Sequence, residues 1–311
     1  MKTTSADEEY AKNSELKRED ITALRKWREA QDGLPELSER DLIVFHQSCF
    51  YNEEDTKSCI QNYFKIRSKH PTYFSNRDPG SDCFKKYNDV IGYYILDGFT
   101  LEGYRVLLMR LINTSPSAYS FNDALKLYTM YSDVMFQSSG SCPGDLIVYD
   151  MAGTSFGHLP KLNVSGFRNM LQYLQEGLPV RLKGIHMINA IPFVDIVINM
   201  MTPFMKKELL DMFQVSTSCE VLNKLLPSRM IPKEYGGDGK SLPELHANDV
   251  KRMEPEGDSH TYGGTPPSSW EKSRNLVEFL YYLRIFVWVK RGSLEPTTWK
   301  NLFLHFLHVI T

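Results

Sequence analysis

The feature that most restricts the fold of this chain is an alternation of strand-like and helix-like segments that starts near residue 90. The strand-like runs are short and apolar, and they cover residues 93–97, 104–112, 145–153 and 181–191. The segments with helical spacing of apolar residues cover 121–137, 161–176 and 192–214. Because strands that alternate with helices pair in parallel through crossover connections, the sequence predicts an α/β fold with a largely parallel sheet flanked by helices.

A helical segment precedes this alternation. Apolar residues at helical spacing, a break at Gly33 and Pro35, and a capping pattern of Ser38 with Asp41 predict three helices between residues 16 and 70. A hinge rich in Pro, Gly and Asp follows. The chain therefore divides into a polar N-terminal extension (1–19), a helical N-terminal lobe (20–80), an α/β domain (85–250) and a linker with an apolar C-terminal tail (251–311).

The tail leaves alternatives open. Its uninterrupted apolar run, 285–289, is far shorter than the roughly 20 residues that span a bilayer. We expect a helix packed on the body of the protein. A helix that lies on a membrane surface or binds a partner protein is the alternative.

Charge and cysteine content restrict the class of protein further. The chain has 36 basic and 38 acidic residues, a net charge of −2, which is too balanced for a protein that binds the nucleic-acid backbone. Its five cysteines are scattered and form no C-x-x-C pair, which argues against a disulfide framework and a zinc ribbon. The polar N-terminus lacks the apolar core of a secretory signal. We expect a cytoplasmic protein without a metal or cofactor.

The strongest enzyme-like motif is the G-x-S-x-G pattern at 153–157, which follows an apolar strand as a hydrolase nucleophile would. Ser155 would then be the nucleophile of a serine esterase. Its partners would be Asp195 or Asp211 with His246 or His260. However, the residues after Ser155 do not begin a helix, so a loop of small residues is the favoured interpretation. His158, His186 and Cys142 show no spacing typical of metal ligands.

An apolar stripe in the segment after Pro192 is more informative. Spacing of three and four residues places Val194, Val197, Ile198, Met201 and Met205 on one helical face. Such a stripe is either part of the core or the wall of a cavity. Its spacing alone does not distinguish the two.

A set of ordered motifs runs through the α/β domain: LIVYDMAG at 146–153, GLPVRLKGIHMIN at 177–189, Pro203-Phe204 and IPKEYGG at 231–237. This set resembles the CRAL-TRIO lipid-transfer family, and in particular its tocopherol- and retinaldehyde-binding branch. Residues 24–42 and 62–74 resemble the family's N-terminal helical domain. The resemblance covers roughly residues 20–245.

The resemblance implies a helical lobe followed by a sheet-floored apolar pocket, with the helix after the Ile188-Asn189 strand as a mobile gate over one buried lipid. The positions that correspond to pocket residues of the family are Leu127, Tyr131, Tyr149, Met170, Tyr173, Leu174, Leu178, Leu182, Ile185, Val194, Val197, Ile198 and Met201. Tyr131 is the preferred polar anchor for the ligand. A core tyrosine bonded to backbone is the alternative for this residue.

The resemblance also implies contact with membranes. Arg181 and Lys183 match two basic positions through which some members bind phosphoinositide, whereas Gln47 and Met212 stand where further basic residues are expected. A charge-assisted phosphate clamp is therefore incomplete. Lys206 and Lys207 follow Phe204 in the gate and could meet an anionic bilayer. Of Phe193, Met200 and Phe204, we expect at least one to stay at the surface when the gate is closed.

These features together favour a non-catalytic carrier that moves a small hydrophobic lipid, such as a tocopherol, retinoid or carotenoid-like molecule, between membranes. The expected partners are that lipid and, transiently, a membrane surface that includes phosphoinositides, with no nucleic acid. Two alternatives come from other classes: a serine esterase that acts on lipid esters through Ser155, and an adaptor that uses the fold as an interaction platform.

Overall fold

The computed structural model describes residues 4–253. The linker and apolar tail predicted after residue 251 lie outside the described residues, apart from 251–253. A five-stranded sheet forms the centre of the fold, with the order β1-β2-β3-β4-β5. Its strands are β1 (Ile91–Ile95), β2 (Tyr104–Leu111), β3 (Gly144–Asp150), β4 (Leu182–Ile188) and β5 (Phe213–Val215). β1 is antiparallel to β2, and every other pair is parallel. The predicted largely parallel sheet is confirmed.

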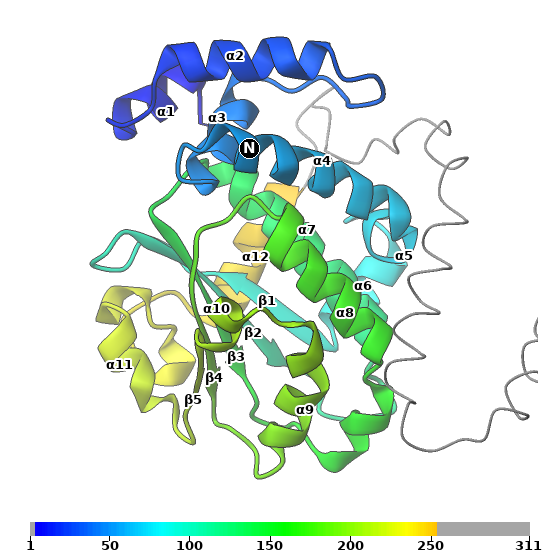
Figure 1. The fold of residues 1–311 in the computed structure, drawn as a ribbon. Helices are drawn as coiled ribbons and strands as arrows, with labels where there is room; N and C mark the ends of the chain where they lie inside the picture. The colour runs from blue at the N-terminus through cyan, green and yellow to red at the C-terminus, as the bar shows by residue number, and fades with distance from the viewer. Residues whose placement is uncertain (1–3, 254–311) are drawn as a thin grey trace, which may run out of the picture. The chain divides into compact units, whose positions relative to one another are not determined.

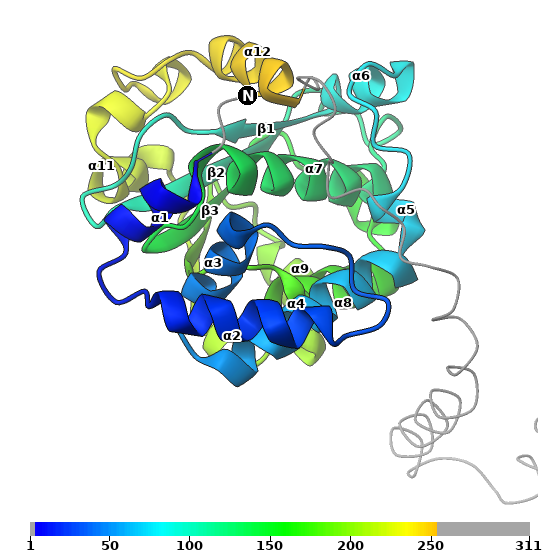
Figure 2. The same cartoon turned by 90° about the horizontal axis from the view of Figure 1, so that it is seen from above.

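Helices cover both faces of this sheet (Figures 1 and 2). The crossover helices α7 (Phe121–Ser139), α8 (Val164–Gln172) and α9 (Val194–Met201) lie on one face. On the other face lie α11 (Leu222–Leu225) and α12 (Leu242–Met253). α12 also follows the free edge of β1, where the Asp249 carboxylate accepts a hydrogen bond from the Ile95 N–H at 2.9 Å.

The strands are apolar on both faces because both faces are covered. In β2, Val106 and Leu108 pack with α11 and α12, whereas Leu107 and Leu111 pack with α7 and the helical lobe. This two-residue alternation directs one set of side chains toward the crossover helices. The candidate site lies on that side.

Six helices precede the sheet: α1 (Ala6–Lys12), α2 (Arg18–Glu29), α3 (Glu39–Ser48), α4 (Glu53–Lys69), α5 (Pro71–Phe74) and α6 (Asp82–Asn88). The predicted capping box at the start of α3 is confirmed, with Ser38 and Asp41 bonded reciprocally. The segment predicted as a polar extension contains α1. The side chain of Glu9 in this helix is fully buried and accepts a hydrogen bond from the Ser141 hydroxyl.

A buried ionic cluster fixes the helical lobe to the rest of the fold. We call it the Asp133 network, and it comprises Arg67, Arg77, Asp133 and Tyr173. The Arg67 guanidinium donates to both carboxylate oxygens of Asp133 at 3.1 and 3.0 Å, and Arg77 donates to the same carboxylate at 2.7 Å. Arg67 also donates to the Tyr173 hydroxyl at 3.1 Å. α4 and α7 are therefore joined by paired charges, and the segment after α8 is joined to them by a hydrogen bond to the Tyr173 hydroxyl.

Two predicted helices differ from the structure. The helix predicted over 192–214 is wrong as one element, because α9 ends at Met201 and gives way to a 3₁₀ turn (Thr202–Phe204), the short helix α10 (Lys207–Leu210) and β5. Pro203 explains the break, since it has no N–H and its ring clashes with the preceding turn of a helix. The helix predicted over 161–176 begins at Val164, and after α8 it continues as a π-helical turn, Tyr173–Gly177. Among the described helices, none is long and apolar enough to span a membrane.

Candidate functional site

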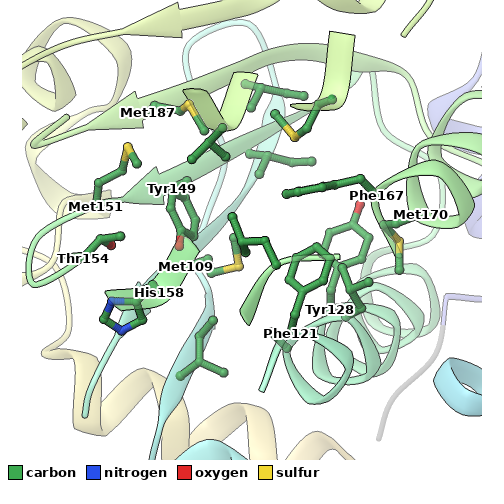
Figure 3. Close-up of a pocket in the computed structure, with 18 of the residues that line it drawn as sticks. Met109, Phe121, Tyr128, Tyr149, Met151, Thr154, His158, Phe167, Met170 and Met187 are labelled. Atoms are coloured by element: carbon green, nitrogen blue, oxygen red, sulfur yellow. The ribbon is translucent and has the colours of Figure 1, made fainter. Parts of the chain in front are cut away.

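A cavity of about 200 Å³ lies between the sheet and the crossover helices (Figure 3). Its floor is formed by alternate residues of four strands, which are Ile91, Tyr93, Met109, Leu111, Ile147, Tyr149, Ile185 and Met187. α7 and α8 supply its walls through Phe121, Ala124, Leu125, Tyr128, Phe167, Met170 and Leu171. Phe193, Val197 and Met201 contribute from α9 and the residue before it. The lining is almost entirely apolar.

Three polar side chains, Tyr149, Thr154 and His158, lie together at one end of this cavity. Phe121 and Phe167 lie toward the opposite end together with Tyr128, which also carries a hydroxyl (Figure 3). Burial raises the pKa of Tyr149 to about 12, so its phenol is neutral at physiological pH. This end of the cavity therefore offers polar atoms, including those of a neutral phenol, to a molecule that is otherwise surrounded by apolar side chains.

A tightly packed loop after β3 places Thr154 and His158. Gly153 has φ +81°, and a Cβ there would lie 2.3 Å from Thr114, so only glycine fits. The backbone N–H of Ser155 donates to His158 Nδ1 at 3.1 Å, and the ring edge packs on Tyr119 with centroids 5.5 Å apart. These contacts fix the imidazole at the cavity wall.

The segment from Phe193 to Lys206, which includes α9, forms the cover of the cavity. Two contacts hold this cover in place. Phe193, just before α9, stacks on Phe156 with ring centroids 4.0 Å apart. At the other end of α9, the Gln175 side chain donates to the carbonyl of Phe204 at 3.0 Å and accepts from the N–H of Lys206 at 2.7 Å. We call these two bonds the Gln175 latch.

Two parts of the sequence match models of known protein families. The model of the CRAL/TRIO domain matches residues 90–237, which contain all five strands and the cavity. Residues 90–237 of this chain therefore form a CRAL/TRIO domain. A Pinta-like UBA domain model matches residues 13–84, in the helical lobe.

The chain is also similar to several named proteins. It is 25% identical over 254 residues to the mouse (Mus musculus) alpha-tocopherol transfer protein-like, covering 79% of this chain and 73% of that protein. It is 24% identical over 240 residues to mouse clavesin-1, covering 74% of this chain and 66% of that protein. Among solved structures, the crystal structure of Sfh5 is 14% identical with a TM-score of 0.45, covering 79% of this chain and 93% of that chain.

The structure brings together six of the thirteen pocket positions implied by the resemblance. The six that line the cavity are Tyr149, Met170, Leu174, Ile185, Val197 and Met201. Leu127, Tyr131, Tyr173, Leu178, Leu182, Val194 and Ile198 do not line it. That the six bind a lipid remains a prediction.

The seven other side chains have different surroundings. The Tyr131 hydroxyl donates to Asn88 at 3.0 Å and contacts His246 Nδ1 at 3.2 Å, so it is engaged away from the cavity and is not its polar anchor. Tyr173 belongs to the Asp133 network. Leu178 and Leu182 line a separate space of about 10 Å³. The remaining three, Leu127, Val194 and Ile198, pack in the hydrophobic core.

Thr154 and His158 were missed as pocket residues in the sequence. The available signal was their position directly after a strand that ends at the edge of the sheet. Neither the G-x-S-x-G pattern nor the spacing of metal ligands indicates these two side chains as pocket residues. In the described part of the chain, no group of three His, Cys, Asp or Glu side chains could hold a metal ion.

Within the described residues, Ser155 and its candidate partners are not brought together as a hydrolase triad requires. The Ser155 hydroxyl contacts His158 Nδ1 at 3.1 Å, but that nitrogen already accepts the Ser155 N–H. Asp195 and Asp211 are exposed, and His246 contacts Tyr131. His260 lies outside the described residues.

The basic residues are engaged differently from a phosphate clamp. Arg181 Nε donates to the Gln47 carbonyl at 2.7 Å, and its guanidinium lies 4.2 Å from the centre of the Phe50 ring. Lys183 is exposed. Met212 precedes β5, and its carbonyl accepts from the Ile185 N–H at 3.0 Å. Lys206 and Lys207 are exposed at the start of α10.

The outer surface of the cover also differs in part from the expectation. Phe193 is buried, and Met200 and Phe204 are half-buried against the core. Ile196, in the first turn of α9, is instead 46% exposed, and Phe156 is 63% exposed. The large apolar side chains that face solvent near the cover are therefore Ile196 and Phe156.

Proposed function

We propose that this CRAL-TRIO protein binds one small hydrophobic lipid in the cavity and transfers it between membranes without changing it chemically. The observation that carries the proposal is the apolar cavity under a cover with two contact points. Transfer of a lipid from water into such a site gains about 0.8 kcal/mol for each CH₂ group. The names of the relatives, which include tocopherol transfer, support the same class of ligand.

The size of the cavity bears on how the lipid is held. Its volume of about 200 Å³ is below the roughly 300–1,000 Å³ of most small-molecule sites. A tocopherol or retinoid therefore requires the walls to move outward. Five methionines line the cavity, namely Met109, Met151, Met170, Met187 and Met201. Their flexible side chains can repack around different ligands at low cost.

Membrane contact would occur at the cover. Ile196 and Phe156 offer exposed apolar surface next to the Phe193 stack, and Lys206 and Lys207 follow in the chain. Each lysine near an anionic surface contributes about 1 kcal/mol of attraction. We propose this surface, rather than a phosphoinositide clamp at Arg181, as the main contact, because the Arg181 guanidinium already bonds Gln47 and stacks on Phe50.

A matched pair of variants on α9 tests the binding site. Val197 lines the cavity, whereas its neighbour Ile196 faces solvent. Val197→Trp should fill the cavity and lower the uptake of retinol and α-tocopherol at least tenfold. Ile196→Trp should leave uptake within about twofold of the wild type. Melting temperatures of both variants show whether each remains folded.

Two further measurements test the carrier proposal as a whole. Native mass spectrometry of the purified protein should detect one bound lipid, or one retinol or α-tocopherol after loading. A fluorophosphonate probe should not label Ser155. The proposal fails if no lipid is bound or taken up. Labelling that disappears in Ser155→Ala would favour the esterase instead.

A further inference from the structure

Two unsatisfied polar atoms face the same ligand site. Of the described residues, three side chains have a buried polar atom without a hydrogen-bond partner, and two of these, Thr154 and His158, line the cavity. The atoms are Thr154 Oγ1 and His158 Nε2. His158 is only 4% exposed. A buried polar group without a partner costs roughly 1–3 kcal/mol, so two at one end of an apolar cavity indicate that a ligand supplies what is missing.

The hydrogen bond at the other ring nitrogen decides which atom His158 requires. A backbone N–H can only donate, and the Ser155 N–H lies 3.1 Å from Nδ1, whereas the Ser155 carbonyl, which can only accept, lies 3.3 Å from the same nitrogen. The shorter contact favours Nδ1 as the unprotonated acceptor, which places the ring proton on Nε2. The free Nε2–H is a donor that lacks an acceptor. The ligand must present an oxygen to it.

The second unsatisfied group is compatible with the same oxygen. The Thr154 hydroxyl can donate or accept, and it lies close enough to the Tyr149 hydroxyl to lower the pKa of that phenol, although the contact does not meet hydrogen-bond geometry. A carbonyl oxygen can accept from both Nε2–H and Thr154. A hydroxyl oxygen can accept from Nε2–H and donate to Thr154. A carbonyl group and a hydroxyl group of the ligand can therefore each satisfy His158 and Thr154 while remaining uncharged.

The electrostatics of the lining argue against an anionic ligand. The described residues that line the cavity include no Lys, Arg, Asp or Glu. A carboxylate or phosphate buried there would lose its hydration without a cation to compensate for it, which is far more costly than burial of a hydroxyl or carbonyl. Fatty acids and phospholipid headgroups therefore fit this end poorly.

The backbone of the loop that carries the two residues is closely packed. A Cβ at Gly157 would lie 2.7 Å from Pro116, and one at Gly153 would lie 2.3 Å from Thr114. The loop thus packs closely on the segment before α7. The two polar groups remain part of the cavity wall.

We propose that the ligand is a neutral lipid with one terminal oxygen, an alcohol or a carbonyl compound, which accepts a hydrogen bond from His158 Nε2–H and pairs with the Thr154 hydroxyl. This inference rests on the proposed carrier function and narrows its ligand class. It assigns Thr154 and His158 as the groups that select the ligand's polar end.

A series of four retinoids tests the proposal with the full chain: retinol, retinaldehyde, retinoic acid and the hydrocarbon that carries hydrogen in place of the retinol hydroxyl. We expect retinol and retinaldehyde to bind at least tenfold more tightly than the acid and the hydrocarbon. Thr154→Val, which keeps the side-chain shape, should lower retinol affinity about tenfold and leave hydrocarbon affinity within twofold. His158→Phe should do the same.

Controls separate recognition from folding. His158→Gln retains an N–H donor near the position of Nε2 and should recover part of the affinity for retinol. Ser165→Ala removes an exposed hydroxyl that bonds Asn163 and does not line the cavity, and it should change no affinity more than twofold. The proposal is overturned if both Thr154→Val and His158→Phe leave the preference for retinol over the hydrocarbon unchanged, or if retinoic acid binds most tightly. If the wild type binds none of the four retinoids, the carrier function itself is refuted.

Discussion

Replacement of Gln175 by alanine removes both bonds of the Gln175 latch while it leaves the cavity lining unchanged. Gln175 lies in the π-helical turn after α8, and its amide bonds the backbone on both sides of Met205. These bonds join the chain segment that follows α9 to the body of the protein. If the cover opens to release a lipid, the two bonds exist only in the closed state.

The size of the effect follows from the two contacts. A hydrogen bond of this kind stabilises by about 0.5–1.5 kcal/mol net, so the pair contributes about 1–3 kcal/mol to closure. The Gln175 side chain is only half-buried, so water competes for these groups and the lower half of the range is expected. Loss of about 1–2 kcal/mol raises the open population roughly 5- to 30-fold. Lipid release should accelerate by the same factor if opening limits it.

Stopped-flow transfer of retinol from the protein to vesicles with a fluorescence acceptor measures the release rate, and hydrogen exchange measures opening of residues 202–206. Gln172→Ala is a matched control, because Gln172 is exposed and bonds only Glu176, at 3.1 Å. Gln175→Ala should accelerate both processes, and Gln172→Ala neither. Unchanged hydrogen exchange in Gln175→Ala would show that the latch does not hold the cover closed. Faster exchange with an unchanged release rate would show that opening does not limit release.

Three further predictions concern stability and transfer. Asp133→Asn should lower the free energy of unfolding in urea by about 3–5 kcal/mol, because its buried arginine partners lose their counter-charge. Burial would raise the pKa of Asp133, but the two arginines outweigh burial and lower this pKa. The wild type should therefore lose the stabilisation only as the pH falls below about 4, and Asp133→Asn should not show that loss. Burial raises the pKa of Asp249 to about 7, above its value in the unfolded chain. The contribution of Asp249 to the free energy of unfolding should therefore decline as the pH rises from about 4 through 7. In urea unfolding across this range, Asp249→Asn should not show that decline. Ile196→Asp should slow retinol transfer to vesicles several-fold with retinol affinity unchanged, whereas Phe204→Asp should also lower the affinity and the melting temperature, because Phe204 is half-buried against the core.

The sequence predicted the sheet because its signals are local. The runs that became β2 and β3 are largely apolar and begin just after Gly103 and at Gly144, and Ser38 with Asp41 form the reciprocal cap that their spacing indicates. The break in the helix predicted over 192–214 could also have been predicted, since Pro203 is a strong helix breaker. The apolar stripe that continues past it favoured one long helix, but in the structure β5 takes up the end of that segment as the edge strand of the sheet.

The polar anchor was not accessible in the same way. Tyr131 is directed away from the cavity by Asn88 and by His246, which lies 115 residues further along the chain. No periodicity reports a contact over that separation. His158 faces the cavity because Ser155 holds its other nitrogen and the surrounding loop packs closely. Which nitrogen remains free is decided by one backbone hydrogen bond, and sequence patterns do not determine it.

The two contact points of the cover respond differently to a membrane. In water, opening would expose Phe193 and Val197, which now face the cavity, and full exposure of such a side chain costs about 1.5–3 kcal/mol. At a bilayer surface, lipid tails can accept Phe156, Phe193 and Ile196 together, so this cost largely disappears. The Gln175 latch is polar and gains nothing from the tails. If the protein is a carrier, we therefore expect the aromatic stack to hold the cover closed in water and to yield at the membrane, with the latch setting the remaining barrier to release.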